Sequence, residues 1–411
     1  MLRAGVPIAV IITVGAGAVM MLTGKTNEML TGHGKQEGSN PAPGATGGGA
    51  PAGGAAGGAA GGASGTLTPN AFTGYPGQHG DVLVSSIASS GGTSLAAGSA
   101  DGHPAIWRRA ADGAWTLASV TSPAVFRRPG VERLTSIAHG PAGWVAVGNV
   151  VSGAAQQPVV VTSADGVTWH ALDSLAAFAG PRNYVMGVTS GPGGYVVVGQ
   201  QANRGRMFAA LWWSADLKNW TLGSNGHLDG RLLSSTVYAV TAAPIGFVAA
   251  GTHGNCHSIW MSSDGRQWHV LDVVVPRGAS SAMLNLLAVN GRNVVAAGYA
   301  VMKTGGNVPI VIVSHDGGMV WKQMVLTAPG GFGAVTSLTA AGSGFLAAGL
   351  AGPAGAQRAV TWRSHDGVNW STAIPAGIGS RQITALAAVG GAVTATVQQG
   401  TDPYTMTLPA S

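Results

Sequence analysis

A repeat of about fifty residues limits the folds open to this chain more than any other feature. Six segments end in a tryptophan that follows an aspartate, and successive tryptophans are 48 to 54 residues apart. The aspartates are Asp112, Asp165, Asp216, Asp264, Asp316 and Asp366, and the tryptophans are Trp115, Trp169, Trp220, Trp268, Trp321 and Trp370. Two apolar runs separated by a glycine-containing turn precede the later copies, as in 134–148 and 185–199. A period of this length predicts stacked copies of one small structural unit.

Each repeat predicts a four-stranded antiparallel sheet. The two apolar runs form a hairpin, a third run such as 158–163 follows, Asp-Gly turns the chain, and tryptophan opens a fourth strand. Both faces of such a small sheet need cover, and radial stacking of the sheets supplies it. The chain is therefore predicted to be all-β, a β-propeller of four-stranded blades. Small residues in the second strands, as in 145–148, are expected to relieve crowding at the axis, and the tryptophans to wedge between neighbouring blades.

The recurrent element Ser-x-Asp-x-x-x-Trp, for example 262–268, resembles the Asp-box (BNR) repeat of sialidase-like and sortilin-like propellers. The resemblance covers residues 81–411 and implies the propeller fold. Three copies depart from the pattern. The first lacks the serine, the third has Leu217 in place of the turn glycine, and the fifth carries one extra residue, so altered hairpins are expected there.

The number of blades depends on the two ends of the repeat region. Residues 383–397 and 403–408 predict three further strands, but no tryptophan strand follows them. Residues 65–70 could supply the missing outer strand and close the ring. We therefore predict seven blades closed by the N-terminal and C-terminal parts of the chain. Six blades with a terminal appendage is the alternative.

The N-terminal region differs sharply from the repeats. Residues 5–22 carry no charge and Arg3 precedes them, so residues 1–24 predict a transmembrane signal anchor with the body of the protein outside. A cleaved signal peptide, with secretion of the protein, is the alternative. Residues 25–65 are rich in Gly, Ala and Pro and predict a disordered, flexible linker. The expected domains are thus the anchor at 1–24, the linker at 25–65 and the propeller at 66–411, in a single-pass protein of the cell membrane.

The residues offer little with which to build a catalytic site. The sialidase resemblance would imply an arginine cluster, a tyrosine nucleophile with its glutamate, and an aspartate acid/base, yet Glu132 is the only glutamate beyond the linker. Half of the 12 aspartates there lie in the repeated turns, where they are expected to be structural. His253, Cys256 and His257 lack the paired spacing of a zinc or haem site. We predict no catalysis, no metal and no cofactor.

Arginines suggest one binding surface. The formal charge is +6, but no run of like charges indicates nucleic acid. Five arginines precede a new first strand: Arg133, Arg182, Arg231, Arg277 and Arg381. They are expected to form an electropositive rim at one mouth of the propeller channel. The predicted function is an extracytoplasmic protein–protein scaffold in the cell envelope; the alternatives are binding of an anionic cell-wall glycan or phosphate polymer, and a degenerate glycoside hydrolase.

Overall fold

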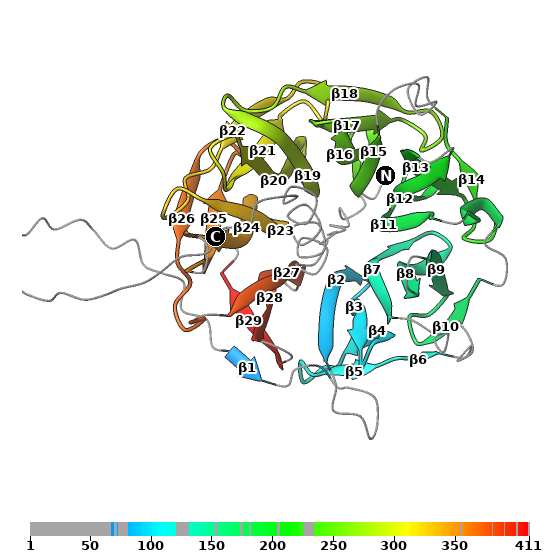
Figure 1. Ribbon diagram of the computed structural model, residues 1–411. Helices are drawn as coiled ribbons and strands as arrows, with labels where there is room; N and C mark the ends of the chain where they lie inside the picture. Colours follow the sequence, from blue (N-terminus) through cyan, green and yellow to red (C-terminus); the bar gives the residue numbers. More distant parts are fainter. Residues whose placement is uncertain are drawn as a thin grey trace, which may run out of the picture.

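The computed structural model is an all-β propeller with seven blades around a central axis (Figure 1). We call the region around this axis, which the first strands surround, the channel. It describes residues 67–69, 72, 81–120, 131–152, 155–172, 176–180, 182–203, 206–224, 234–353, 356–379, 381–389, 391–399 and 402–409. The predicted anchor at 1–24 and linker at 25–65 lie outside the described residues. Within the described ranges, no helix is long and apolar enough to cross a bilayer.

The blades follow one another along the chain, each with its first strand innermost (Figure 1). Blade 1 holds β2 (Val82–Ser90), β3 (Thr93–Ala100), β4 (His103–Arg109) and β5 (Trp115–Leu117), and blade 2 holds β7 (Val131–Gly140), β8 (Gly143–Ser152), β9 (Ala155–Ser163) and β10 (Thr168–Ala171). Blade 3 holds β11 (Tyr184–Gly191), β12 (Gly194–Asn203), β13 (Arg206–Ser214) and β14 (Thr221–Leu222), and blade 4 holds β15 (Ser235–Ala243), β16 (Gly246–His253), β17 (Cys256–Ser262) and β18 (His269–Val273). Blade 5 holds β19 (Ala279–Asn290), β20 (Asn293–Met302), β21 (Asn307–Ser314) and β22 (Lys322–Val325), and blade 6 holds β23 (Gly333–Ala341), β24 (Gly344–Ala351), β25 (Arg358–Ser364) and β26 (Trp370–Ala373).

Blade 7 joins the two ends of the propeller domain. Its inner strands are β27 (Gln382–Val389), β28 (Ala392–Gln399) and β29 (Asp402–Leu408), and its outer strand is β1 (Leu67–Pro69). Strand β1 pairs antiparallel with β29, with Thr68 opposite Thr405. The predicted closure and the count of seven blades are therefore confirmed. One detail differs from the expectation, because β6 (Ser119–Val120), which follows blade 1, adds a fifth strand parallel to β10 of blade 2.

The core lies between neighbouring blades. First strands contact each other around the whole ring, and β2 contacts β27 to complete it. Trp169 belongs to a buried cluster that joins blades 1 and 2, and Trp268 to one that joins blades 3 and 4. The third strands add further buried indoles, such as Trp212 and Trp362, which the repeat pattern did not single out.

The glycine that ends each small-residue run has a different role from the one expected. Gly148, Gly199 and Gly298 each lie opposite a β-bulge in the first strand of the same blade. A Cβ at any of these glycines would overlap the carbonyl oxygen that the bulge brings toward it. Close approach of two strands within a blade therefore selects glycine here, rather than crowding at the axis.

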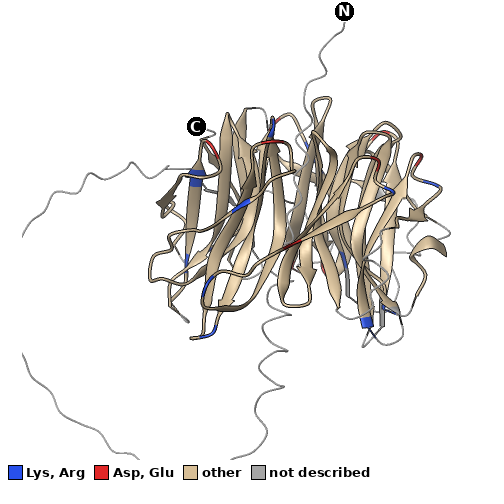
Figure 2. Ribbon diagram, turned by 90° about the horizontal axis from the view of Figure 1, so that it is seen from above, with Lys and Arg blue, Asp and Glu red and all other residues tan. Residues whose placement is uncertain are grey.

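The disc has two faces that the strand directions define (Figure 2). We call one the turn face, because it carries the turns between first and second strands and those between third and fourth strands, including the repeated aspartates. The other is the linker face, which carries the segments between blades and the hairpins between second and third strands. Asp and Glu, drawn red in Figure 2, lie mainly along one face of the disc, as expected for the aspartate turns. Because β1 is antiparallel to the third strand of its blade, its N-terminal end at Leu67 lies on the turn face.

Candidate functional site

The repeated aspartates organise their turns. In blade 2 the Asp165 carboxylate accepts hydrogen bonds from the backbone N–H groups of Val167 and Thr168, at 2.8 and 2.9 Å. The Ser163 hydroxyl donates to the same oxygen at 2.9 Å and accepts from the Gly166 N–H at 2.8 Å. These bonds stabilise the charged form and lower the pKa of Asp165 to about 2. A carboxylate engaged in this way is a structural acceptor and is poorly placed to move protons.

The turn of blade 3 keeps this geometry although it lacks the glycine. Leu217 adopts a φ of +63°, and its N–H donates to the Ser214 hydroxyl as the glycine does elsewhere. Its side chain is buried in the cluster between blades 2 and 3, which also holds Trp212. Burial of the leucine offsets the strain of the left-handed conformation. The altered hairpin expected here is therefore not present.

The structure describes four of the five arginines predicted to form the rim. Arg182 and Arg277 are exposed in the segments before β11 and β19, on the linker face. Arg381 is half-buried, donates to the Ile378 carbonyl at 3.2 Å and lies over the Tyr404 ring. Its guanidinium is therefore already engaged by neighbouring residues of the chain. Arg231 lies outside the described residues.

Arg133 is located differently from the sequence expectation. It lies inside β7 rather than in the segment before it. Its Nε donates to the Ser85 hydroxyl of blade 1 at 2.8 Å, and it also interacts electrostatically with Tyr184 of blade 3. A side chain of blade 2 that reaches both neighbouring blades must lie on the channel side of its strand. Burial lowers the pKa of Arg133, although the residue stays partly exposed, which fits a position on the inner side of the ring.

Tyrosines and methionines continue this wall across the next blades. Met186, Tyr238, Met283 and Tyr299 form one buried cluster, with Tyr184 packed against it. Met186 and Tyr238 occupy the bulges of β11 and β15, and Met283 lies opposite Tyr299 in blade 5. We call Arg133, Tyr184, Met186, Tyr238, Met283 and Tyr299 the channel cluster. All its first-strand members lie near the starts of their strands, so the cluster lines the channel at its linker-face end.

The tyrosines of the channel cluster are electrostatic neighbours. Burial is the main cause that raises the pKa values of Tyr184, Tyr238 and Tyr299. The charge of ionised Tyr238 would also raise the pKa values of Tyr184 and Tyr299. Tyr238 is therefore close to both of these tyrosines and lies between them. Arg133, Tyr184, Tyr238 and Tyr299 therefore follow one another around the channel through blades 2 to 5.

Polar residues occupy the corresponding bulges in the other blades. These are Ser85 in blade 1, Thr135 in blade 2, Asn285 in blade 5, Thr336 in blade 6 and Thr384 in blade 7. Thr384 bonds to Thr396, and Thr336 donates to the backbone. The sequence itself shows this asymmetry. The residue at the bulge differs between the blades, whereas the residues directly before and after it are small or aliphatic in every blade. The bulge residues in chain order are Ser85, Thr135, Met186, Tyr238, Asn285, Thr336 and Thr384.

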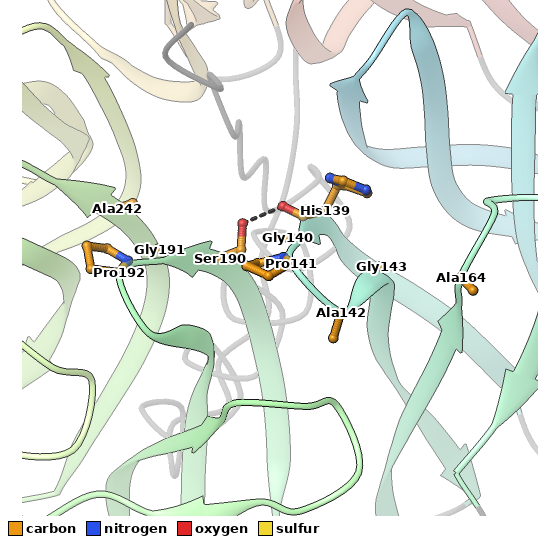
Figure 3. A pocket seen from close by; sticks show the side chains of 10 residues that line it. All are labelled: His139, Gly140, Pro141, Ala142, Gly143, Ala164, Ser190, Gly191, Pro192 and Ala242. Carbon is orange, nitrogen blue, oxygen red and sulfur yellow. Dashed lines mark hydrogen bonds between the residues drawn. The ribbon is translucent and has the colours of Figure 1, made fainter. Parts of the chain in front are cut away.

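A depression of about 800 Å³ opens on the turn face between blades 2 and 3 (Figure 3). Its lining consists mainly of Gly, Ala and Pro from the turns of these two blades, together with Ala242 of blade 4. Tyr195 holds the blade 2 turn by donating to the Gly143 carbonyl at 2.9 Å. His139 is the one titratable group of the lining, and burial lowers its pKa. The depression offers a shape but few groups for chemistry.

The histidines and cysteine of the 253–257 segment do not assemble a reactive site. Asp272 accepts from Ser258 at 2.7 Å and pairs with His253 at 2.9 Å, so the carboxylate lies between the hydroxyl and the imidazole. A nucleophilic serine needs the imidazole in that middle position. His257 is fully buried and Cys256 is partly exposed. Among the described residues, no three metal-ligating side chains come together.

Comparisons with known proteins show the fold. No family model matches the chain, and a search of curated proteins found no match. A solved structure described as YCF48 bound to D1 peptide is similar, with a TM-score of 0.52 and 12% identity over 84% of this chain and 95% of that one. The Hadza microbial sialidase Hz136 gives 0.43 and 14% over 66% and 65% of the two chains, and the Dos1 propeller gives 0.46 and 11% over 79% and 77%. The first of these likenesses supports the propeller fold of this chain.

Proposed function

We propose that this protein is a membrane-tethered, extracytoplasmic β-propeller without catalytic activity that binds a partner protein at the linker-face mouth of its channel. The channel cluster carries the proposal. Aromatic and methionine side chains gathered beside a cation, as at this end of the channel, are a typical composition for a protein-binding surface. The propeller bound to a peptide, to which this chain is similar in fold, supports the same class of function.

The distribution of carboxylates argues against a hydrolase. Glycosidases generally need a pair of carboxyl groups that can exchange protons near neutral pH. The turn aspartates Asp165, Asp264 and Asp316 instead have lowered pKa values, because backbone and serine groups bond to their charged forms. The Asp-box resemblance therefore supports a shared fold and turn design, and we propose no shared chemistry.

The entry point of the N-terminal region supports the choice of face. Residues 1–66 join the propeller at Leu67 on the turn face. If residues 1–24 anchor the chain, the flexible linker at 25–65 keeps the turn face nearer the membrane on average but does not fix the orientation of the disc. The linker face, with the channel cluster, is then on average farther from the bilayer and open to a partner.

Site-specific photo-crosslinking tests the proposed function. A benzophenone amino acid at position 184, within the channel cluster, should give a discrete protein adduct in intact cells. The same probe at Lys218, exposed on the turn face, serves as the control. The adduct from position 184 should disappear in a Tyr238→Ala background. Equal adducts from both positions, or an adduct that ignores the Tyr238 change, would contradict the proposal.

Binding of an anionic cell-wall polymer is the second candidate. Arg182 and Arg277 are exposed on the linker face, and this observation favours it. Such binding should weaken steeply with salt and fall in the double variant Arg182→Ala/Arg277→Ala. Affinity for a glycerol-phosphate polymer that ignores both changes would exclude this alternative.

A further inference from the structure

We propose that the channel mouth recognises a peptide segment that carries a carboxylate beside apolar side chains, with Arg133 as the group that binds the carboxylate. The inference rests on the proposed function and names the chemistry of the partner. It depends on three features of the channel wall: an unpaired cation, an apolar arc and a polar arc.

Among the described residues, this cation has no counter-ion. Among the described residues the one ion pair joins His253 and Asp272, so no described carboxylate lies within 4.0 Å of Arg133. Its Nε donates to the Ser85 hydroxyl, which orients the plane of the guanidinium, and no hydrogen bond joins its two terminal nitrogens to another described residue. A largely buried charge without a partner is costly, and a carboxylate can bond two guanidinium nitrogens at once. Arg133 can therefore bind a carboxylate of a ligand.

The apolar arc lies beside this cation. Tyr184 of blade 3 interacts with Arg133, and Met186, Tyr238, Met283 and Tyr299 extend the same surface through blades 3 to 5. Methionine adapts to ligands of different shape, and tyrosine offers a large rigid face with a polar tip. An aliphatic or aromatic side chain next to the ligand carboxylate would fill this arc.

The polar residues of blades 6 and 7, on the opposite side of the channel, favour a peptide over a highly charged ligand. Thr336 and Thr384 occupy the bulges of the opposite blades and are already hydrogen-bonded to neighbouring strands, so the described bulge positions of this polar arc carry small polar groups and no cation. A polyphosphate or nucleic acid would need several cations to compensate its charge. One cation flanked by an apolar arc instead fits an amphipathic peptide, with its apolar side toward blades 3 to 5 and one acidic group at Arg133.

Selection from a phage-displayed library of random 12-residue peptides tests this proposal on the full chain in lipid nanodiscs. Peptides selected by the unchanged protein should be enriched in Asp or Glu next to Leu, Phe or Tyr. A selected peptide should bind Arg133→Gln at least about tenfold more weakly, the loss expected for a hydrogen-bonded charge pair. Changing its acidic residue to the amide should weaken binding to the unchanged protein but not to Arg133→Gln. The exposed Arg182→Gln is the matched control and should bind normally.

The outcomes separate the two proposals. Failure to enrich any peptide would overturn the proposed peptide-binding function and this inference with it. Enrichment of apolar peptides without an acidic preference, or an acidic preference that persists in Arg133→Gln, would overturn the inference alone. Circular dichroism and thermal unfolding of Arg133→Gln and Arg133→Lys establish that the variants are folded. Arg133→Lys should recover only part of the affinity, because lysine cannot bond a carboxylate through two nitrogens.

Discussion

At the scale of single residues, most of the acidic side chains in the repeats hold turns together. The sequence allowed this to be predicted, because Asp followed by Gly between apolar runs has one common structural use. The exact role of Leu217 could not be predicted. Its positive φ depends on burial between blades 2 and 3, which only the assembled ring provides. Local turn chemistry is thus visible in the sequence, whereas compensation from a neighbouring blade is not.

The turn aspartates predict loss of stability in acid. Asp165 and Asp316 have pKa values of about 2 in the fold, against about 3.9 in an unfolded chain. Their stabilising effect is therefore complete above about pH 4 and is lost as the pH falls toward 2. The double variant Asp165→Asn/Asp316→Asn should have a lower Tm at pH 7 and a smaller further drop between pH 5 and 2.5. Thermal unfolding across this range measures both, with Asp81→Asn as the control for charge; parallel profiles would contradict the expectation.

At the scale of strands, the repeat pattern predicted the hairpins and their order, but it assigned the wrong cause to the recurrent glycine. The alternation of apolar runs and turns specifies which strands pair. A bulge has no comparable signature, because it adds one residue to a strand whose other positions keep their pattern. Blade 7 has the same bulge opposite Val397 rather than glycine, so the sequence alone could not show that the bulge and the glycine belong together.

Close strand approach predicts that Gly298 cannot be replaced. Gly298→Ala places a Cβ against the Met283 carbonyl oxygen, which forces the strands of blade 5 apart. We expect a loss of about 1–3 kcal/mol in the free energy of unfolding, as for other overpacked sites. Val397→Ala at the equivalent position of blade 7 is the control. It should lower the free energy of unfolding by no more than the loss of two buried methyl groups. Chemical denaturation measures both variants, and equal behaviour of Gly298→Ala and the unchanged protein would refute the bulge explanation.

Closure through β1 predicts a specific cross-link. Thr68 lies opposite Thr405 in the antiparallel pair, and opposite residues are close enough for a disulfide. In a Cys256→Ser background, Thr68→Cys/Thr405→Cys should oxidise within one molecule and raise the Tm. The bond would close a loop of about 340 residues, for which chain entropy sets an upper limit of about 6 kcal/mol. Thr68→Cys alone is the control, and absence of the intramolecular bond after oxidation would contradict the register.

At the scale of the whole molecule, the sequence predicted the ring but not the surface on which function depends. Features that recur in similar blades, such as the turn aspartates and the arginines before first strands, are visible as repeats in the sequence. The channel cluster breaks the symmetry, since it changes the bulge residue in blades 3 and 4 and adds Tyr299 from a second strand. Its members come together only because the ring closes, so their proximity could not be obtained from spacing along the chain.

The point where the N-terminal region joins the ring predicts how the proposed tether orients the molecule. Cys256 is the first residue of β17, at the linker-face end of the strand, is partly exposed, and is the only cysteine of the sequence. In intact cells a membrane-impermeant maleimide should label it if the propeller is extracytoplasmic. A fluorophore at Cys256 should also transfer energy to a lipid-bound acceptor less efficiently than one at Lys218→Cys on the turn face in a Cys256→Ser background. Removal of residues 1–24 should abolish transfer from both positions, because the linker then has no anchor. Labelling only after lysis would place the propeller inside the cell, and equal transfer from the two faces would show that the linker imposes no orientation.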